Sequence, residues 1–250
     1  MVRGRSDRTS KNSKNCCIFA YHKIWFNLKL FRKRDFITLG FILIFSAAAV
    51  YMFYVILKPV EVLPIYQPAE VNEKLVDSSI IHVAKYHKIT NFKLTNQNGE
   101  EITQANYKDK IYVADFFFTT CQDICPVMTK NMYQLQEELK NDNEILLLSH
   151  TVIPEVDTVE QLKEYAIENN VNDSKWNLVT GDKKQIYELA RKSYLAVEDS
   201  NYNEYDMIHT ENFMLIDKEK QIRGFYDGTN SEEINRLLKD IEILKQSYNK

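Results

Sequence analysis

The sequence predicts an α/β domain preceded by one membrane-spanning helix. Residues 36–57 carry no charged side chain, apolar runs typical of buried strands recur after residue 110, and segments with helical periodicity stand between these runs. The chain has 250 residues, of which 44% are hydrophobic. It is therefore long enough for one compact domain of ordinary size and an appendage.

The appendage consists of a basic segment, 1–35, and the apolar segment 36–57. At about 1.5 Å per residue the apolar segment can cross a hydrocarbon core of roughly 30 Å. It is also longer than the apolar region of a cleaved signal peptide, which runs roughly 7–15 residues. Segment 1–35 holds ten Lys and Arg against two Asp. The positive-inside rule therefore predicts a cytoplasmic N-terminus and a C-terminal domain beyond the membrane.

The rest of the chain is acidic, with 22 Lys and Arg against 33 Asp and Glu. This balance argues against nucleic-acid binding. We expect a bacterial inner membrane with the domain in the periplasm; a basic N-terminus also suits a mitochondrial import signal, so the mitochondrial inner membrane is the alternative. Cys16 and Cys17 then lie on the reducing side, with no role that the sequence assigns. Cys121 and Cys125 lie where disulfides can form.

The exported part divides into a tether and a domain. Residues 58–87 hold three of the five prolines and are expected to form an extended tether, and the domain is expected at 88–250. Its first element is a hairpin over residues 91–103, because Asn98-Gly99 separates two short polar–apolar alternations.

Strands and helices then alternate. We expect strands at 110–118, 144–152, 176–181, 212–217 and 221–228, and helices at 126–140, 158–170, 183–194 and 231–246. Ser231 is the expected N-cap of the last helix. This order, which ends in a hairpin and a helix, predicts a sheet of the thioredoxin type.

Two cysteines stand where the strand 110–118 leads into a helix, in the sequence "ADFFFTTCQDICPVMTKNM". Asp123 is a candidate N-cap and Pro126 fits the first helical turn, which places Cys125 in that turn. The positive potential of a helix start lowers the pKa of thiols, so we expect both Cys121 and Cys125 to be reactive.

The Cys-x-x-x-Cys spacing leaves a disulfide, a nucleophile and a metal site open. Thioredoxin-like reductants usually use Cys-x-x-Cys, and the wider gap permits both a disulfide and bidentate metal binding. Thiolates favour Cu(I), Zn or Fe–S, and a third ligand is needed to complete a site. His82 and His87 are expected to be solvated, whereas His150 ends a strand and His209 lies in the loop that faces the cysteines in a thioredoxin-type sheet.

Four stretches resemble, in order and spacing, the Sco/SenC family of membrane-anchored copper proteins: "FFFTTCQDICPVM", "PEVDTVEQLKEYA", "WNLVTGD" and "MIHTENFMLID". The resemblance runs from about residue 88 to 245. It implies a thioredoxin-like fold that binds copper, Cu(I) or Cu(II), through Cys121, Cys125 and His209.

The family delivers copper to the dinuclear copper centre of cytochrome c oxidase, or reduces the cysteines of that centre. The resemblance therefore implies two partners, the oxidase subunit that carries this centre and a thiol reductase. Asp157 matches an acidic position of the family, although a helix N-cap explains it equally well. One stretch departs: "SHTVIPE" stands where the family often has Ser-Val-Asp-Pro, and this change is expected to bring His150 near the site.

Two other functions remain open from the residues. A membrane-tethered thiol–disulfide oxidoreductase could use Cys121 and Cys125, so whether the protein is an enzyme is left undecided. A peroxidase-like enzyme is disfavoured, because no Arg lies near either cysteine in the sequence.

Overall fold

The computed structural model describes residues 33–57, 61–71, 76–196 and 210–248. The chain forms two compact units, 1–60 and 61–250. The first unit contains helix α2 (Lys33–Leu57), whose stretch Asp35–Leu57 is the only helix of the described residues that is long and apolar enough to cross a membrane. This helix agrees with the anchor that the sequence predicts.

A seven-stranded sheet forms the centre of the second unit, in the order β2-β1-β5-β4-β3-β6-β7. The strands are β1 (Lys93–Asn96), β2 (Glu101–Thr103), β3 (Ile111–Phe117), β4 (Ile145–Thr151), β5 (Trp176–Thr180), β6 (Asn212–Ile216) and β7 (Ile222–Asp227). Strands β3, β4 and β5 are parallel, while β1 joins β5 and β6 joins β3 in antiparallel pairs. The predicted thioredoxin-like α/β fold is confirmed.

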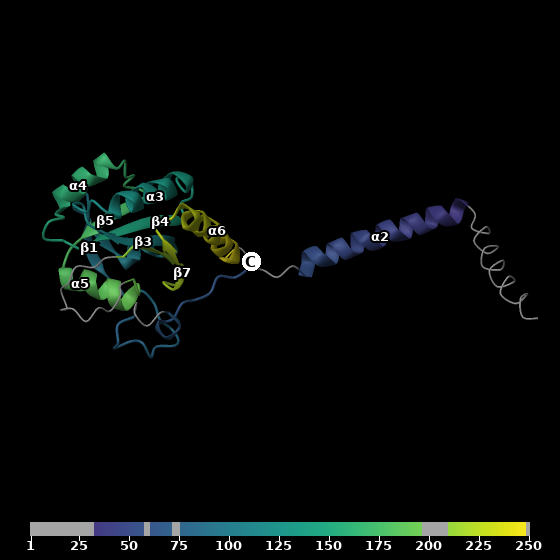
Figure 1. Cartoon of the computed structure of the whole chain (residues 1–250), viewed down its shortest axis with the longest axis horizontal. Coiled ribbons are helices and arrows are strands. Elements are labelled where there is room, and N and C mark those ends of the chain that lie inside the picture. The colour runs from purple at the N-terminus through teal and green to yellow at the C-terminus, as the bar shows by residue number, and fades with distance from the viewer. Residues whose placement is uncertain (1–32, 58–60, 72–75, 197–209, 249–250) are drawn as a thin grey trace, which may run out of the picture. The chain divides into compact units, whose positions relative to one another are not determined.

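Helices cover both faces of the sheet. Helices α3 (Cys125–Glu138) and α4 (Val159–Glu168) lie on one side in Figure 1, and α5 (Lys183–Glu188) lies on the other. The C-terminal helix α6 (Ser231–Tyr248) packs on the same core as α3. Successive residues of β3 point to opposite faces, so Val113 enters the α3 core and Ala114 enters the α5 core.

The first hairpin forms where the sequence predicts it. Leu94 of β1 lies opposite Ile102 of β2. Gly99 has a φ of +76°, a conformation that glycine adopts without steric cost. The side-chain oxygen of Asn96 accepts hydrogen bonds from the backbone N–H groups of Asn98 at 3.0 Å and Glu100 at 2.9 Å. The turn is therefore held by its own residues.

The cap of the last helix differs from the prediction. Ser231 is the first helical residue of α6 rather than its N-cap. Asn230 supplies the capping contact, because its Oδ1 accepts a hydrogen bond from the N–H of Glu232 at 2.9 Å. The N-cap therefore lies one residue earlier than predicted, because the Asn230 side chain also favours the N-cap position.

The described part of the expected tether packs on the domain instead of extending away from it. The N–H of Tyr66 bonds the carbonyl of Ile222 at 2.9 Å, and Val76 is fully buried. Arg223 of β7 donates hydrogen bonds to the carbonyls of Leu63 at 2.6 Å and Pro64 at 2.9 Å. The compact unit therefore begins at residue 61 rather than at 88.

We predict that Arg223→Met destabilises the protein by about 3 kcal/mol, because it leaves the buried carboxylate of Asp217, 3.0 Å from Arg223, without its positively charged partner. Urea unfolding followed by circular dichroism measures the loss. Lys140→Met, which breaks an exposed pair with Glu137, is the matched control and should change stability by less than about 0.5 kcal/mol. Equal effects of the two substitutions would contradict this role for Arg223.

Candidate metal centre

The two cysteines lie at the edge of the sheet where β3 ends. Strand β3 ends at Phe117, a tight turn follows, and α3 begins at Cys125 with Pro126 in its first turn. The N–H of Cys121 bonds the carbonyl of Phe118 at 3.3 Å within the turn. Cys121 is partly exposed, whereas Cys125 is buried. Both thiols are free, and they lie close enough that each shifts the pKa of the other.

The start of α3 has no side-chain cap, so the expected capping role of Asp123 is wrong. The N-cap position is held by Ile124, and no side chain bonds the first backbone N–H groups. The sulfur of Cys121 is close to this turn instead, because the backbone N–H groups of Asp123, Ile124 and Cys125 lower its pKa. The helix start thus presents its unpaired N–H groups to a thiol.

The two thiols differ in acidity for physical reasons. Partial burial alone raises the pKa of Cys121, but hydrogen bonds from Cys125 and from three backbone N–H groups outweigh it and lower that pKa. Deeper burial raises the pKa of Cys125 to about 12, and its hydrogen bond to Cys121 adds to the rise. Cys121 is therefore the more acidic thiol of the pair.

The cysteine turn is tied to the loop after β4 by Asp157. This buried carboxylate accepts hydrogen bonds from the hydroxyl of Thr119 at 2.6 Å, from the Thr119 N–H at 3.2 Å, and from the hydroxyl of Thr151. Asp157 is not a helix cap, because the N-cap of α4 is Thr158. Asp157 therefore fixes Thr119, which lies two positions before Cys121. In the sequence, only the family resemblance points to Asp157.

A second buried carboxylate lies beside the site, on the face of β3 that packs under α3. Asp115 is 2% exposed, and its Oδ1 has no hydrogen-bond partner among the described residues. Burial raises the pKa of Asp115 to about 7, against a hydrogen bond with Ser149 that lowers it. Its charge also contributes to the raised pKa of Cys125. Sequence reasoning missed Asp115, although an acidic residue within an apolar run indicates a buried carboxyl group.

His150 does not join the cysteines. It is fully buried, its ring stacks on Phe116 at 4.8 Å, and it also contacts Phe92 and Tyr194. These aromatic residues belong to the α5 core, whereas Cys125 belongs to the α3 core on the other face. Burial lowers the pKa of His150 to about 4. The expectation that the changed loop brings His150 near the site is therefore wrong.

Two more of the histidines are described. His82 is exposed, as expected. His87 was expected to be solvated, but it is half-buried and its Nε2 contacts the carbonyl of Ser193 at 2.8 Å. Among residues 33–57, 61–71, 76–196 and 210–248, no group of three His, Cys, Asp or Glu side chains could hold a metal ion. His209 lies outside the described residues, so the predicted third ligand stays a prediction.

The chain nevertheless enters β6 at the edge that carries the cysteines. Strand β6 runs antiparallel to β3, with Met214 opposite Ala114 and Ile216 opposite Tyr112. The first residues of β6, from Asn212, therefore lie beside the end of β3, close to where the cysteine turn begins.

We predict that iodoacetamide at pH 7.5 modifies Cys121 much faster than Cys125, because only the thiolate reacts and the pKa of Cys121 is the lower of the two. Peptide mapping by mass spectrometry measures each rate, and Cys125→Ser isolates the reaction of Cys121. The rate at Cys121 should rise with pH and reach half of its maximum below pH 9, the ordinary thiol value, because the pKa of Cys121 is lowered. Faster modification of Cys125 would contradict this assignment.

Comparison with known proteins agrees with the fold. The SCO1/SenC family model matches residues 82–245. The SCO1 protein homolog of Bacillus subtilis (strain 168) is 30% identical over 158 residues, which cover 62% of this chain and 82% of that protein. The solved structure of a SCO1/SenC family lipoprotein from Bacillus anthracis str. Ames is 31% identical, with a TM-score of 0.57, and covers 64% of this chain and 95% of its own.

Two further structures carry functional descriptions of their own proteins. BsSco, a member of the Sco family of cytochrome c oxidase assembly proteins with a disulfide switch, is 28% identical with a TM-score of 0.55, over 63% of this chain and 93% of its own. Bradyrhizobium japonicum ScoI, solved with copper bound, shares the fold at 23% identity and a TM-score of 0.50, over 62% of this chain and 99% of its own. Because the family model spans more than half of the sequence, this chain belongs to the SCO1/SenC family.

Proposed function

We propose that the protein binds one copper ion through Cys121, Cys125 and His209 and uses it in the assembly of cytochrome c oxidase. The observation that carries the proposal is the pair of neighbouring free thiols at the start of α3, each of which shifts the pKa of the other. Two neighbouring thiolates are the soft ligands that Cu(I) prefers.

The charge of the ligand set suits both oxidation states of copper. Two thiolates and one neutral imidazole carry a charge of −2, which neutralises Cu(II) and leaves a Cu(I) complex at −1. The buried Cys125 must lose its proton to bind, so metal binding should release protons. An open three-ligand site suits delivery, because the ligand of an acceptor can attack the bound ion.

Two features support His209 as the third ligand. It precedes Asn212 by three residues, and Asn212 begins the strand that enters the sheet beside the cysteine turn. His150, the other histidine next to a strand end, lies in the core of the opposite face. His209 is therefore the histidine that lies close in sequence to the edge of the sheet that carries the cysteines.

The assembly role is supported by the family. BsSco, its relative of known structure, is described as a cytochrome c oxidase assembly protein, and ScoI of Bradyrhizobium japonicum carries copper. We propose that the partner here is the oxidase subunit with the dinuclear copper centre. Since a disulfide between Cys121 and Cys125 cannot bind Cu(I), a thiol reductase that keeps the pair reduced is a second partner.

A thiol–disulfide oxidoreductase is the alternative function, and the acidities of the cysteines favour it. A partly exposed Cys121 with a lowered pKa is suited to attack a disulfide, and a buried Cys125 beside it is suited to resolve the mixed disulfide. The acceptor disulfide would gain two electrons and two protons, and Cys121 and Cys125 would become a disulfide.

We predict that Cys121→Ser, Cys125→Ser and His209→Ala each weaken copper binding by more than the roughly 10–100-fold that is typical of losing an outer-shell partner. Competition with a Cu(I) chelator measures the affinity of the full-length chain in detergent. His82→Ala, which changes an exposed histidine, is the control and should bind as the unchanged chain does. Full binding by His209→Ala together with loss in His150→Ala would show that the wrong histidine was chosen.

Transfer of metal to a reduced acceptor distinguishes the two functions. The copper-loaded chain is mixed with an oxidase copper-site fragment whose cysteines are reduced, and free thiols and copper are then counted on each partner. A carrier should pass its metal while its own thiols are conserved. Absence of transfer, combined with thiol exchange when the fragment is oxidised, would instead assign the oxidoreductase function.

The same proposal places the domain outside the cytoplasm of a bacterial inner membrane, with the mitochondrial inner membrane as the alternative. The support is the basic segment 1–35 beside the apolar helix Asp35–Leu57. Protease added to spheroplasts should digest the domain, while a cytoplasmic marker protein stays intact. Protection of the domain until detergent is added would reverse the orientation.

A further inference from the structure

A pocket of about 500 Å³ lies at the end of the sheet remote from the cysteines. Its floor is the short 3-10 turn η3 (Gln104–Tyr107), which precedes β3, and its opposite wall is the turn between β6 and β7, with Lys218 and Lys220. Phe92 supplies an aromatic wall beside Tyr107, with their ring centroids 6.3 Å apart. The volume lies within the range of ligand sites, roughly 300–1,000 Å³.

The floor of the pocket is held rigidly. The hydroxyl of Thr103 accepts a hydrogen bond from the N–H of Ala105 at 3.3 Å, and the side chain of Asn106 accepts one from the N–H of Thr103 at 2.8 Å. These reciprocal bonds form a capping box, so η3 keeps its shape without a ligand. A ligand would therefore meet a preformed wall.

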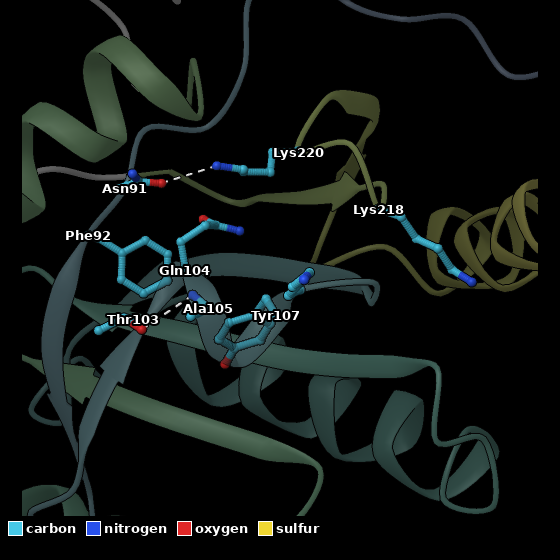
Figure 2. A pocket seen from close by; sticks show the side chains of 9 residues that line it. Asn91, Phe92, Thr103, Gln104, Ala105, Tyr107, Lys218 and Lys220 are labelled. Carbon is cyan, nitrogen blue, oxygen red and sulfur yellow. Dashed lines mark hydrogen bonds between the residues drawn. The ribbon is translucent and has the colours of Figure 1, made fainter.

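One polar atom in the floor is unsatisfied. Gln104 is only 7% exposed, and its Oε1 has no hydrogen-bond partner among the described residues. Figure 2 shows its amide group in the pocket, near Phe92 and Lys220. A buried amide oxygen without a partner costs free energy, which a ligand N–H or O–H donor would recover.

The pocket also gathers positive charge on an otherwise acidic domain. Lys220 contacts the side-chain oxygen of Asn91 at 3.1 Å, and no acidic side chain of the described residues pairs with Lys220 or Lys108. Lys218 is different, since its amine points toward α6 and pairs with Glu144 (Figure 2). Two ammonium groups, Lys108 and Lys220, are therefore left to bind an anion.

The ligand that fits must combine three features in a small space: a donor for Gln104, an anion for the lysines and an apolar body for the aromatic wall. The last residue of a polypeptide has all three on one carbon atom, namely an amide N–H, a terminal carboxylate and a side chain. We propose that this pocket binds the free carboxyl terminus of a partner polypeptide that ends in an apolar residue.

Such a ligand would leave the copper site free. The pocket lies before the first residue of β3 and the cysteine turn after its last, and a seven-residue strand spans about 20 Å. A partner anchored through its terminus could therefore be held while its metal site approaches Cys121. The inference does not depend on the copper proposal, because none of the pocket residues belongs to the metal site.

The test uses a fluorescein-labelled octapeptide with the C-terminal sequence Ser-Gly-Ser-Leu, and the same peptide with a terminal carboxamide. Fluorescence anisotropy measures binding to the full-length chain in detergent, with and without copper. The free carboxylate should bind at least about tenfold tighter than the carboxamide, because charge-assisted hydrogen bonds are lost. Copper should not change either affinity.

Variants then assign the binding to the pocket. Lys220→Gln and the nearly isosteric Gln104→Leu should each weaken binding of the carboxylate peptide several-fold, whereas Lys140→Gln, an equal change of charge just after the end of α3, should not. Unchanged circular dichroism shows that each variant is folded. Equal binding of the two peptides, no binding of the carboxylate peptide, or equal effects of Lys220→Gln and Lys140→Gln would each overturn the proposal.

Discussion

The arrangement of the site depends on the short turn between the end of β3 and the start of α3. Because α3 begins at Cys125 without a side-chain cap, its first N–H groups are free to bond the sulfur of Cys121. The same turn buries Cys125 and leaves Cys121 at the surface, so one constraint sets both the proximity and the unequal acidity of the thiols. Asp157 holds this turn by accepting a hydrogen bond from Thr119. This bond links the site to the loop after β4, which departs from the family pattern.

The sheet separates the molecule into regions with different tasks. The edge where β3 ends carries the thiols, and the edge where β3 begins carries the cationic pocket around Gln104. The buried aromatic cluster around His150 fills the α5 face and gives this histidine a structural role. A copper site at one edge and a partner site at the other would let one domain hold its partner and transfer metal at the same time.

The strands, the hairpin and the position of the cysteines could be predicted from the sequence, because apolar periodicity and the Asn98-Gly99 turn are local signals. What could not be predicted depends on distant contacts. The sequence places His150 at the end of a strand, but it does not tell which face of the sheet the side chain enters. Only the packing of the sheet decides this. Residues 58–87 are predicted to form an extended tether because they hold three of the five prolines, yet hydrogen bonds with Ile222 and Arg223 hold residues 63–66 on the domain. In the sequence, Asp115 is only a polar residue within an apolar run. Its proximity to Cys125 depends on where α3 packs on the sheet.

Copper X-ray absorption of the Cu(I)-loaded chain tests the central claim most directly, since it reports the atoms bound to the metal. The account predicts two sulfur neighbours and one imidazole nitrogen in the unchanged protein. In His209→Ala it predicts that the imidazole signal is lost while both sulfur neighbours remain. A spectrum with sulfur neighbours alone in the unchanged protein, or an imidazole signal that persists in His209→Ala, would contradict a copper site formed by Cys121, Cys125 and His209.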